Sequence, residues 1–293
     1  MSANLKQKIS RYVELTKPKV TLLNLLVGVT CFALAAFPNV NPVKLVVFAF
    51  AGYLACGGCG VLNCVYDQNI DKLMLRTSQR ALPSGKVSSR NALFFGVAVT
   101  AGGITLSYLF FNTLTALMMI FGTACYLGVY TVWLKQNSSW NVVIGGAAGC
   151  FAALSGWTAA ANTLSLMPLI ISLVDFLWTP GHLWGLAMKK VAEYKKAGVP
   201  MLSVTAGLKR TAQITFTLNA SVVASSLLFP ALGLAGLLYT AIAVFAGAWF
   251  VFENKRLLSY PTGSTGFRVF LFSMPYLSIL MVGLVLDRVS LVF

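Results

Sequence analysis

Three oxygen-bearing side chains recur at a helical spacing in the first quarter of the chain. Asn63, Asp67 and Asp71 are each four residues apart, so on a helix of about 3.6 residues per turn they share one face. Proteins commonly hold Mg²⁺ through one or two carboxylates together with substrate phosphates. The spacing therefore predicts a magnesium site for a diphosphate, with Asp67 and Asp71 as catalytic residues. The alternative interpretation is a solvated helix end.

Basic residues follow this motif along the chain. Arg76 and Arg80 come directly after it, and a guanidinium can donate two hydrogen bonds to phosphate oxygens. Lys135 ends the apolar segment 113–134, and Lys196 lies in a later basic loop. We interpret these four as candidate diphosphate-binding residues, which would stabilise the negative charge of a leaving group. Arginines and lysines that only set the membrane topology are the alternative.

A second group of polar residues lies near residue 180. Asp175 interrupts an apolar run, where an ionisable side chain usually faces a cavity or a partner. His182, the only histidine, follows seven residues later and falls on nearly the same helical face. We predict that both take part in catalysis. Glu193 and Tyr194, in the loop beyond, complete the set of candidate residues.

The composition places these residues in a membrane protein. The chain of 293 residues is 58% hydrophobic and 10% charged, and its mean hydropathy is +0.80. Such a sequence is typical of an all-α bundle in a bilayer. We expect a single domain, 1–293, with about nine transmembrane helices. The apolar windows are 21–37, 43–66, 91–110, 113–134, 141–161, 164–188, 211–230, 233–252 and 269–286.

The basic residues fix the expected orientation. The net charge of +15 comes mainly from short loops between apolar windows, which indicates membrane topology and anionic lipid rather than nucleic acid. The positive loops alternate: 1–20, 67–90, 135–140, 189–210 and 253–268 are basic, whereas the intervening loops are nearly bare. We therefore expect a cytoplasmic N-terminus, an external C-terminus and chemistry on the cytoplasmic side.

These motifs resemble those of a known family. Asn63, Asp67 and Asp71, followed by Arg76, Thr77 and Arg80, resemble the first motif of the UbiA superfamily of intramembrane prenyltransferases. Four segments are similar to its haem-directed branch: 15–20, 63–85, 130–157 and 175–202. Quinone-directed relatives carry a second Asp-rich motif, where this chain has Leu183, Lys190 and Tyr194. Gly181 stands where the family often has a second proline.

The resemblance implies a specific reaction. A farnesyl group would pass from farnesyl diphosphate to a vinyl group of haem B and give haem O, with Mg²⁺ as cofactor. Asp175 and His182 would position the haem or its iron, or manage the water that completes the product. The apolar runs and the polar, basic N-terminal stretch favour a multi-pass protein of a bacterial inner membrane. A haem A synthase or a terminal oxidase assembly is the expected partner.

Two other functions remain open from the sequence alone. An aromatic prenyltransferase acting on a quinone precursor would share the first motif but not the altered second one. A transporter or structural membrane protein would explain the helices and the charge bias, but not the pairing of Asp67 and Asp71 with arginines.

Overall fold

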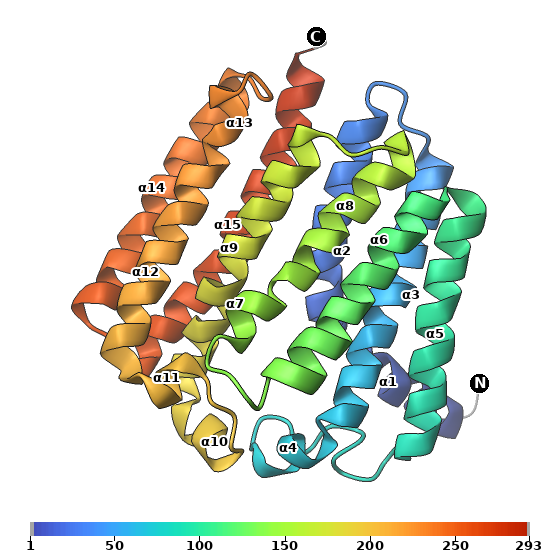
Figure 1. Cartoon of the computed structure of the whole chain (residues 1–293), viewed down its shortest axis with the longest axis vertical. Helices are drawn as coiled ribbons and strands as arrows, with labels where there is room; N and C mark the ends of the chain where they lie inside the picture. The colour runs from blue at the N-terminus through green and yellow to red at the C-terminus, as the bar shows by residue number, and fades with distance from the viewer. Residues whose placement is uncertain (1–2, 292–293) are drawn as a thin grey trace.

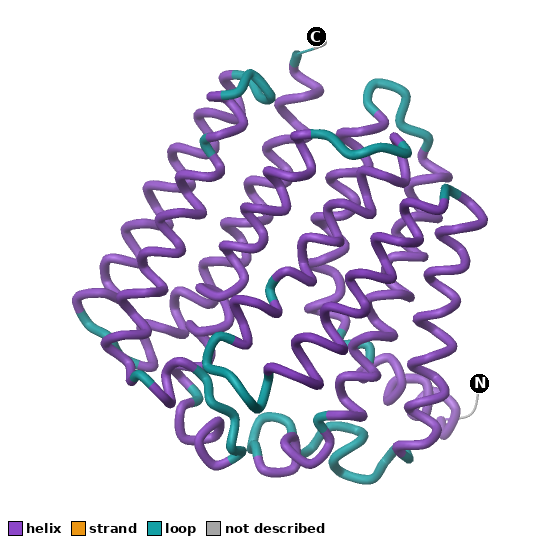
Figure 2. Tube along the Cα trace, in the orientation of Figure 1, coloured by secondary structure: helices purple, strands orange, loops and turns teal. Residues whose placement is uncertain are grey.

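A computed structural model gives the structure of the chain, and it describes residues 3–291. Within that range every regular element is a helix (Figures 1 and 2). Nine helical segments in the described part are long and apolar enough to cross a membrane. The predicted helical class and number of spans are confirmed. The crossings are α2 (Pro18–Ala36), α3 (Pro42–Tyr66), α5 (Ser89–Phe110), α6 (Thr113–Ala124) with η1 (Cys125–Leu134), α7 (Asn141–Gly145) with α8 (Ala147–Ala161), α9 (Leu166–Lys189), α12 (Gly207–Ser226) with α13 (Leu228–Ala231), α14 (Leu237–Ser259) and α15 (Gly263–Ser290).

The four helices outside the nine crossings gather at one end of this bundle, which we call the loop-rich end. They are α1 (Ala3–Leu15), α4 (Gln68–Leu73), α10 (Val191–Lys196) and α11 (Leu202–Thr205), and they lie at the bottom of Figure 1. The last turn of α15 lies at the opposite end, as an odd number of crossings requires. The predicted long loops 67–90 and 189–210 are thus partly helical and lie at the same end as α1.

Proline and asparagine set where several helices begin. Pro18 and Pro42 stand in the first turns of α2 and α3, where the missing N–H has no helical partner to lose. Asn41 precedes Pro42, and its side chain accepts hydrogen bonds from the backbone N–H groups of Val43 and Lys44 at 2.9 and 3.1 Å. These local signals explain why the predicted and observed starts of these spans differ by three residues or fewer.

The last two spans are longer than predicted. α14 runs from Leu237 to Ser259 instead of 233–252, and α15 from Gly263 to Ser290 instead of 269–286. Beyond the apolar windows, Glu253 of α14 receives two hydrogen bonds from Arg268 of α15, at 2.6 and 2.9 Å. This ion pair joins the two helices outside the range that hydropathy marks.

The helices form two groups. α2, α3, α5, α6 and α8 pack together, α9, α12, α14 and α15 form the other group, and the two meet through α8 with α9 and α2 with α15. Glycines allow the closest crossings. A Cβ on Gly156 of α8 would lie 1.9 Å from the backbone oxygen of Gly28 on α2. A Cβ on Gly103 of α5 would lie 2.5 Å from the backbone of α3.

Gly103 and Gly102 offer a matched test of this packing. Gly103→Ala must push α5 away from α3, and overpacking of this kind costs about 1–3 kcal/mol. A Cβ on Gly102 meets nothing within 4 Å, so Gly102→Ala should be neutral or slightly stabilising. We expect only Gly103→Ala to lower the midpoint of thermal unfolding in detergent. Equal midpoints for the two variants would contradict the close approach of α3 and α5.

Candidate active site

The three residues of the first motif lie where α3 meets α4. α3 ends at Tyr66 and α4 begins at Gln68, but helical hydrogen bonding continues across the junction. The N–H of Asp67 donates to the carbonyl of Asn63 at 2.9 Å, and the N–H of Asp71 donates to that of Asp67 at 2.8 Å. The three residues are only 2%, 3% and 6% exposed. This burial distinguishes them from a solvated helix end.

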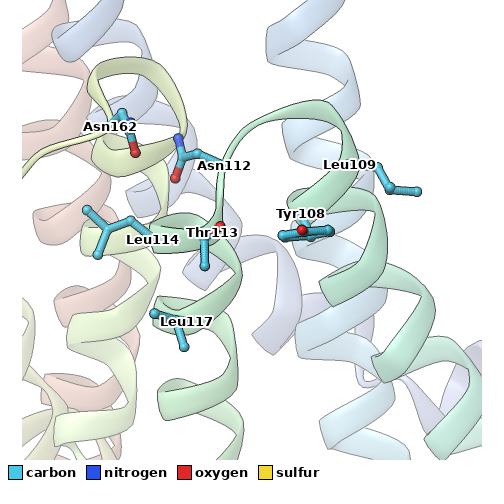
Figure 3. Close-up of a pocket in the computed structure, with 7 residues that line it drawn as sticks. All are labelled: Tyr108, Leu109, Asn112, Thr113, Leu114, Leu117 and Asn162. Atoms are coloured by element: carbon cyan, nitrogen blue, oxygen red, sulfur yellow. The ribbon is translucent and has the colours of Figure 1, made fainter.

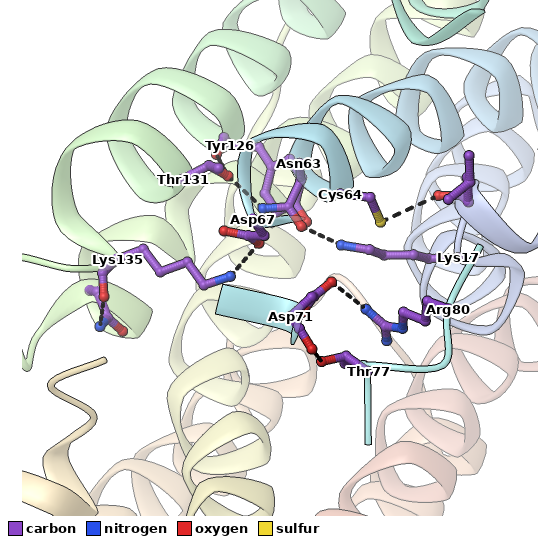
Figure 4. A network of polar contacts seen from close by, with 12 residues as sticks. Lys17, Asn63, Cys64, Asp67, Asp71, Thr77, Arg80, Tyr126, Thr131 and Lys135 are labelled. Atoms are coloured by element: carbon purple, nitrogen blue, oxygen red, sulfur yellow. Dashed lines mark hydrogen bonds and ion pairs between the residues drawn. The ribbon is translucent and has the colours of Figure 1, made fainter. Parts of the chain in front are cut away.

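Each member of the motif has a cationic partner from another segment (Figure 4). Lys17 donates from Nζ to Oδ1 of Asn63, and Lys135 donates from Nζ to Oδ2 of Asp67. Nη1 of Arg80 lies 3.4 Å from Oδ2 of Asp71. These ion pairs and hydrogen bonds join the turn before α2, the end of η1 and the loop after α4 to one site.

Two residues of this network were not among the predicted site residues. Lys17 precedes Pro18 with φ +50° and ψ +59°, and this left-handed backbone conformation turns the chain between α1 and α2. Thr131 accepts a hydrogen bond from Nδ2 of Asn63 at 3.0 Å and donates to the carbonyl of Tyr126 at 2.8 Å. Lys17 was interpreted as a topology signal within a basic N-terminal stretch. Thr131 carries no charge to mark it.

The π-helix η1 explains how Thr131 and Lys135 reach the site. It forms the second half of the fourth crossing, and π-helical segments often occur at functional sites. The N–H of Lys135 donates to the carbonyl of Tyr130, five residues earlier, at 2.9 Å. Burial alone would lower the pKa of Lys135, but nearby Tyr130 and Asp67 outweigh it, and the pKa lies above its ordinary value. Tyr130 and Asp67 thus favour the charged form of Lys135.

The donor set fits a hard divalent cation. Oδ1 of Asp67 is buried and has no hydrogen-bond partner among the described residues, although a carboxylate oxygen is a strong acceptor. The described residues contain no cluster of three or more His, Cys, Asp or Glu side chains that could enclose a metal ion. Asn63, Asp67 and Asp71 would thus supply part of a coordination shell, which is how proteins hold Mg²⁺ beside a phosphate.

Glu193 connects the segment after α9 to the loop after α4. Its Oε1 accepts from Nζ of Lys190 at 2.7 Å, and its Oε2 accepts from the backbone N–H of Arg76 at 3.3 Å. The hydrogen bond from Lys190 is the main reason that the pKa of Glu193 lies below its ordinary value. Tyr194 packs against the apolar cluster that joins α4 to the end of α9. Glu193 thus joins the two loops that flank the site.

The remaining predicted cations differ in their surroundings. The side chain of Arg76 is exposed, and its backbone contact with Glu193 places it at the junction of the two loops. Lys196 is exposed at the end of α10 and makes no ion pair with another described residue. A diphosphate contact by Lys196 therefore stays a prediction.

Asp175 and His182 lie on α9 but face different neighbours. Asp175 is 5% exposed, and a Cβ on Gly149 of α8 would lie 2.2 Å from its Oδ2. His182 is half-buried, and its Nδ1 lies 2.7 Å from Oγ of Ser273 on α15. No hydrogen bond joins the two side chains within residues 3–291. Between them, a Cβ on Gly181 would lie 2.0 Å from Oδ1 of Asn219, so a larger residue there would require the Asn219 side chain to move.

An open pocket at the opposite end of the bundle is unsuited to this chemistry. It has a volume of about 670 Å³ and lies beside the loop between α5 and α6, where Tyr108, Asn112, Leu117 and Asn162 are among its lining residues (Figure 3). Its lining includes no carboxylate, lysine, arginine or histidine. The polar network at the end of α3 is therefore the candidate active site.

Comparison with known proteins identifies the family of this chain. A sequence profile of the UbiA prenyltransferase family matches residues 22–277. A protoheme IX farnesyltransferase of Trichormus variabilis is 41% identical over 97% of this chain and 90% of its own length. Protoheme IX farnesyltransferase 1 of Paramagnetospirillum magneticum is 37% identical over 95% of this chain and 98% of its own length.

Solved structures share the fold. A UbiA homolog from Archaeoglobus fulgidus bound to DMAPP and Mg²⁺ superposes with a TM-score of 0.76 at 20% sequence identity. The match covers 96% of this chain and 99% of the archaeal protein. At this level of identity the similarity shows the bundle architecture.

The Lys135–Asp67 ion pair can be tested through stability. Lys135→Met leaves the Asp67 carboxylate buried without its cation, and breaking such a pair costs about 3–5 kcal/mol. We expect a lower unfolding midpoint in detergent without divalent ions. Lys196→Met, which removes an exposed lysine, should leave the midpoint unchanged.

The double variant Lys135→Met, Asp67→Asn removes both charges and should recover most of the lost stability. Wild-type stability in Lys135→Met alone would show that this lysine does not compensate the buried carboxylate.

Proposed function

The chain belongs to the UbiA prenyltransferase family, and we propose that it transfers a farnesyl group from farnesyl diphosphate to a vinyl group of haem B, giving haem O. The observation that carries this proposal is a buried Asn63–Asp67–Asp71 motif, surrounded by cations, in a chain similar over nearly its full length to protoheme IX farnesyltransferases. We infer haem B as the acceptor from those relatives. We infer a diphosphate as the donor from the acidic motif.

Asn63, Asp67 and Asp71 are the residues that would hold Mg²⁺, with the unpartnered Oδ1 of Asp67 as one ligand. A bound magnesium ion supplies positive charge to the diphosphate oxygens as the carbon–oxygen bond breaks. Support for this metal comes from the archaeal homolog, which was solved with DMAPP and Mg²⁺.

Lys17, Arg80 and Lys135 would bind the diphosphate directly. Their three positive charges exceed the two negative charges of Asp67 and Asp71, so an added anion is favoured. When the bond between C1 of the farnesyl chain and the diphosphate oxygen breaks, the electron pair leaves with the diphosphate. These cations stabilise that charge, and Arg76 at the loop junction adds to it.

The apolar helix bundle would favour formation of the new carbon–carbon bond. The allylic cation left on the farnesyl chain is shielded from bulk water by the helix bundle. The terminal carbon of the haem vinyl group bonds to it, and water adds to the cation formed next to the porphyrin and then loses a proton. The buried carboxylate of Asp175 would orient that water, and Gly149 leaves the space that the carboxylate occupies.

The two competing functions have less support. Two arguments count against a quinone-directed enzyme. Protoheme IX farnesyltransferases match over nearly the whole chain. The loop 189–210 carries Lys190, Glu193 and Tyr194 and no aspartate. A transporter or structural role leaves the buried acidic motif and its cations unexplained.

The reaction can be tested directly by mass spectrometry. Membranes that contain the protein are incubated with haem B, farnesyl diphosphate and Mg²⁺, and the haems are extracted. We expect a new haem heavier by a farnesyl group and a hydroxyl group, and its formation should require the metal. Prenylation of a quinone precursor with haem B left intact would replace the proposed acceptor.

Asp67→Asn tests the motif in the same assay. Loss of the carboxylate removes a metal ligand, and we expect product formation to fall by at least about 100-fold while the protein stays folded in the membrane. Asp287→Asn is a matched control, because Asp287 is also buried but caps the start of α14 at the other end of the bundle. Wild-type turnover in Asp67→Asn would remove this residue from the mechanism.

We further propose that the loop-rich end faces the cytoplasm of a bacterial inner membrane, because its loops carry most of the basic residues. A haem A synthase or a terminal oxidase assembly would receive the product. A protease-sensitive tag at the C-terminus should be cleaved in intact spheroplasts, whereas one at the N-terminus should be cleaved only after lysis. The reverse pattern would place the active site outside.

A further inference from the structure

Two arginines share one carboxylate where α14 and α15 reach the loop-rich end. Nε and Nη2 of Arg268 donate to Glu253 at 2.6 and 2.9 Å, and Nη1 of Arg256 lies 3.7 Å from Oε1 of the same carboxylate. The side chain of Glu253 is 4% exposed, whereas those of Arg256 and Arg268 are 52% and 46% exposed. The acid is therefore buried, and both guanidinium groups reach the surface.

Positive charge exceeds negative charge at this point. Glu253 compensates one of the two guanidinium groups, and the only other acid of α14 and α15, Asp287, caps the start of α14 at the opposite end of the bundle. A separation of 3.7 Å is too long for a hydrogen bond, so within residues 3–291 the side-chain donors of Arg256 make none. A guanidinium with free donors next to a second guanidinium favours an added anion such as a phosphate.

An aromatic ring lies beside each arginine. Cζ of Arg256 is 5.8 Å from the ring centroid of Phe252, and Cζ of Arg268 is 4.9 Å from that of Phe272. A guanidinium over the face of a ring is attracted to it by a cation–π interaction. These contacts and the shared carboxylate restrict the conformations of both arginines, so the pair of cations is held together before any ligand binds.

The aromatic side chains continue from the arginines into the membrane-spanning part of the two helices. Trp249 precedes Glu253 by four residues in α14, and its ring packs edge to face against Phe272 with centroids 5.1 Å apart. Phe272 follows Arg268 by four residues in α15, so both rings lie about 6 Å further from the loop-rich end than the ion pair. Phe252 is 60% exposed, and α14 lies at an edge of the bundle (Figure 1). A cationic site at the membrane boundary thus adjoins an aromatic surface that faces lipid.

We propose that this surface, formed by Trp249, Phe252, Arg256, Arg268 and Phe272, binds an anionic phospholipid. The phosphate would lie between the two guanidinium groups, and an acyl chain would run along the aromatic rings. The order of charged and apolar groups along the surface matches that of a phospholipid in a bilayer. A zwitterionic headgroup would bring an ammonium group next to the arginines, so a headgroup without one is favoured. The inference is independent of the proposed reaction, because none of these residues belongs to the candidate active site.

Arginines that only set the membrane topology are the alternative interpretation. The positive-inside rule depends on charge alone. Lys255 meets that rule although its exposed side chain makes no ion pair and no cation–π contact in the described part of the chain. Arg256, the next residue, contacts both a carboxylate and an aromatic ring. Lys255 is therefore a matched control for the charge of Arg256 without its contacts.

Native mass spectrometry of the purified full-length protein in detergent tests the site. Phosphatidylglycerol and phosphatidylethanolamine with the same acyl chains are titrated separately, and the affinity of the first bound lipid is measured. We expect the wild type to bind phosphatidylglycerol more tightly. Arg256→Gln, which keeps the pair of Glu253 and Arg268, should weaken phosphatidylglycerol binding about 5-fold. Lys255→Gln changes the net charge equally and should leave that affinity unchanged.

Thermal unfolding gives a second measurement. Phosphatidylglycerol should raise the unfolding midpoint of the wild type and of Lys255→Gln more than that of Arg256→Gln. Equal affinities of the two variants, or equal binding of the two lipids by the wild type, would overturn the proposal. Displacement of phosphatidylglycerol by an equal concentration of inorganic phosphate would overturn the phospholipid assignment and leave a general anion site. If Arg256→Gln does not fold, the comparison of the two lipids and the phosphate competition decide.

Discussion

Two carboxylates buried at the end of an apolar bundle need positive charge nearby, and the arrangement of the loop-rich end follows from this requirement. Asp67 and Asp71 are almost fully covered by protein, and an isolated buried carboxylate is too costly to persist in ionised form. Their compensating cations, Lys135 and Arg80, come from the end of η1 and from the loop after α4. The site is therefore assembled by tertiary structure, because α3 alone would leave the acids unpaired.

Close helix packing makes this assembly possible. α3 approaches α5 at Gly103, and α2 approaches α8 where Gly156 meets Gly28. Membrane helices lack a hydrophobic driving force between them, so small residues that allow van der Waals contact largely determine which helices meet. The same packing brings the turn at Lys17 against the side of α3, where the lysine contacts Asn63.

The sequence predicted the parts of this structure that depend on local patterns. Hydropathy located the nine spans, and the four-residue spacing of Asn63, Asp67 and Asp71 put them on one face, because both follow from helical periodicity. Lys17 and Thr131 were missed for different reasons. The charge of Lys17 is equally typical of a cytoplasmic loop, and only a left-handed turn directs it inward. Thr131 reaches Asn63 through a π-helix, and hydropathy does not distinguish a π-helix from an α-helix.

The two helix groups of the fold carry side chains of different chemistry. The charged network belongs to the group that contains α3 and η1, whereas α9 and α15 present His182 between aromatic rings. The contacts of α8 with α9 and of α2 with α15 hold the two groups together within the bundle. The loop contact through Glu193 connects the groups again at the loop-rich end, so the relative position of the two groups is fixed both inside the bundle and at its end.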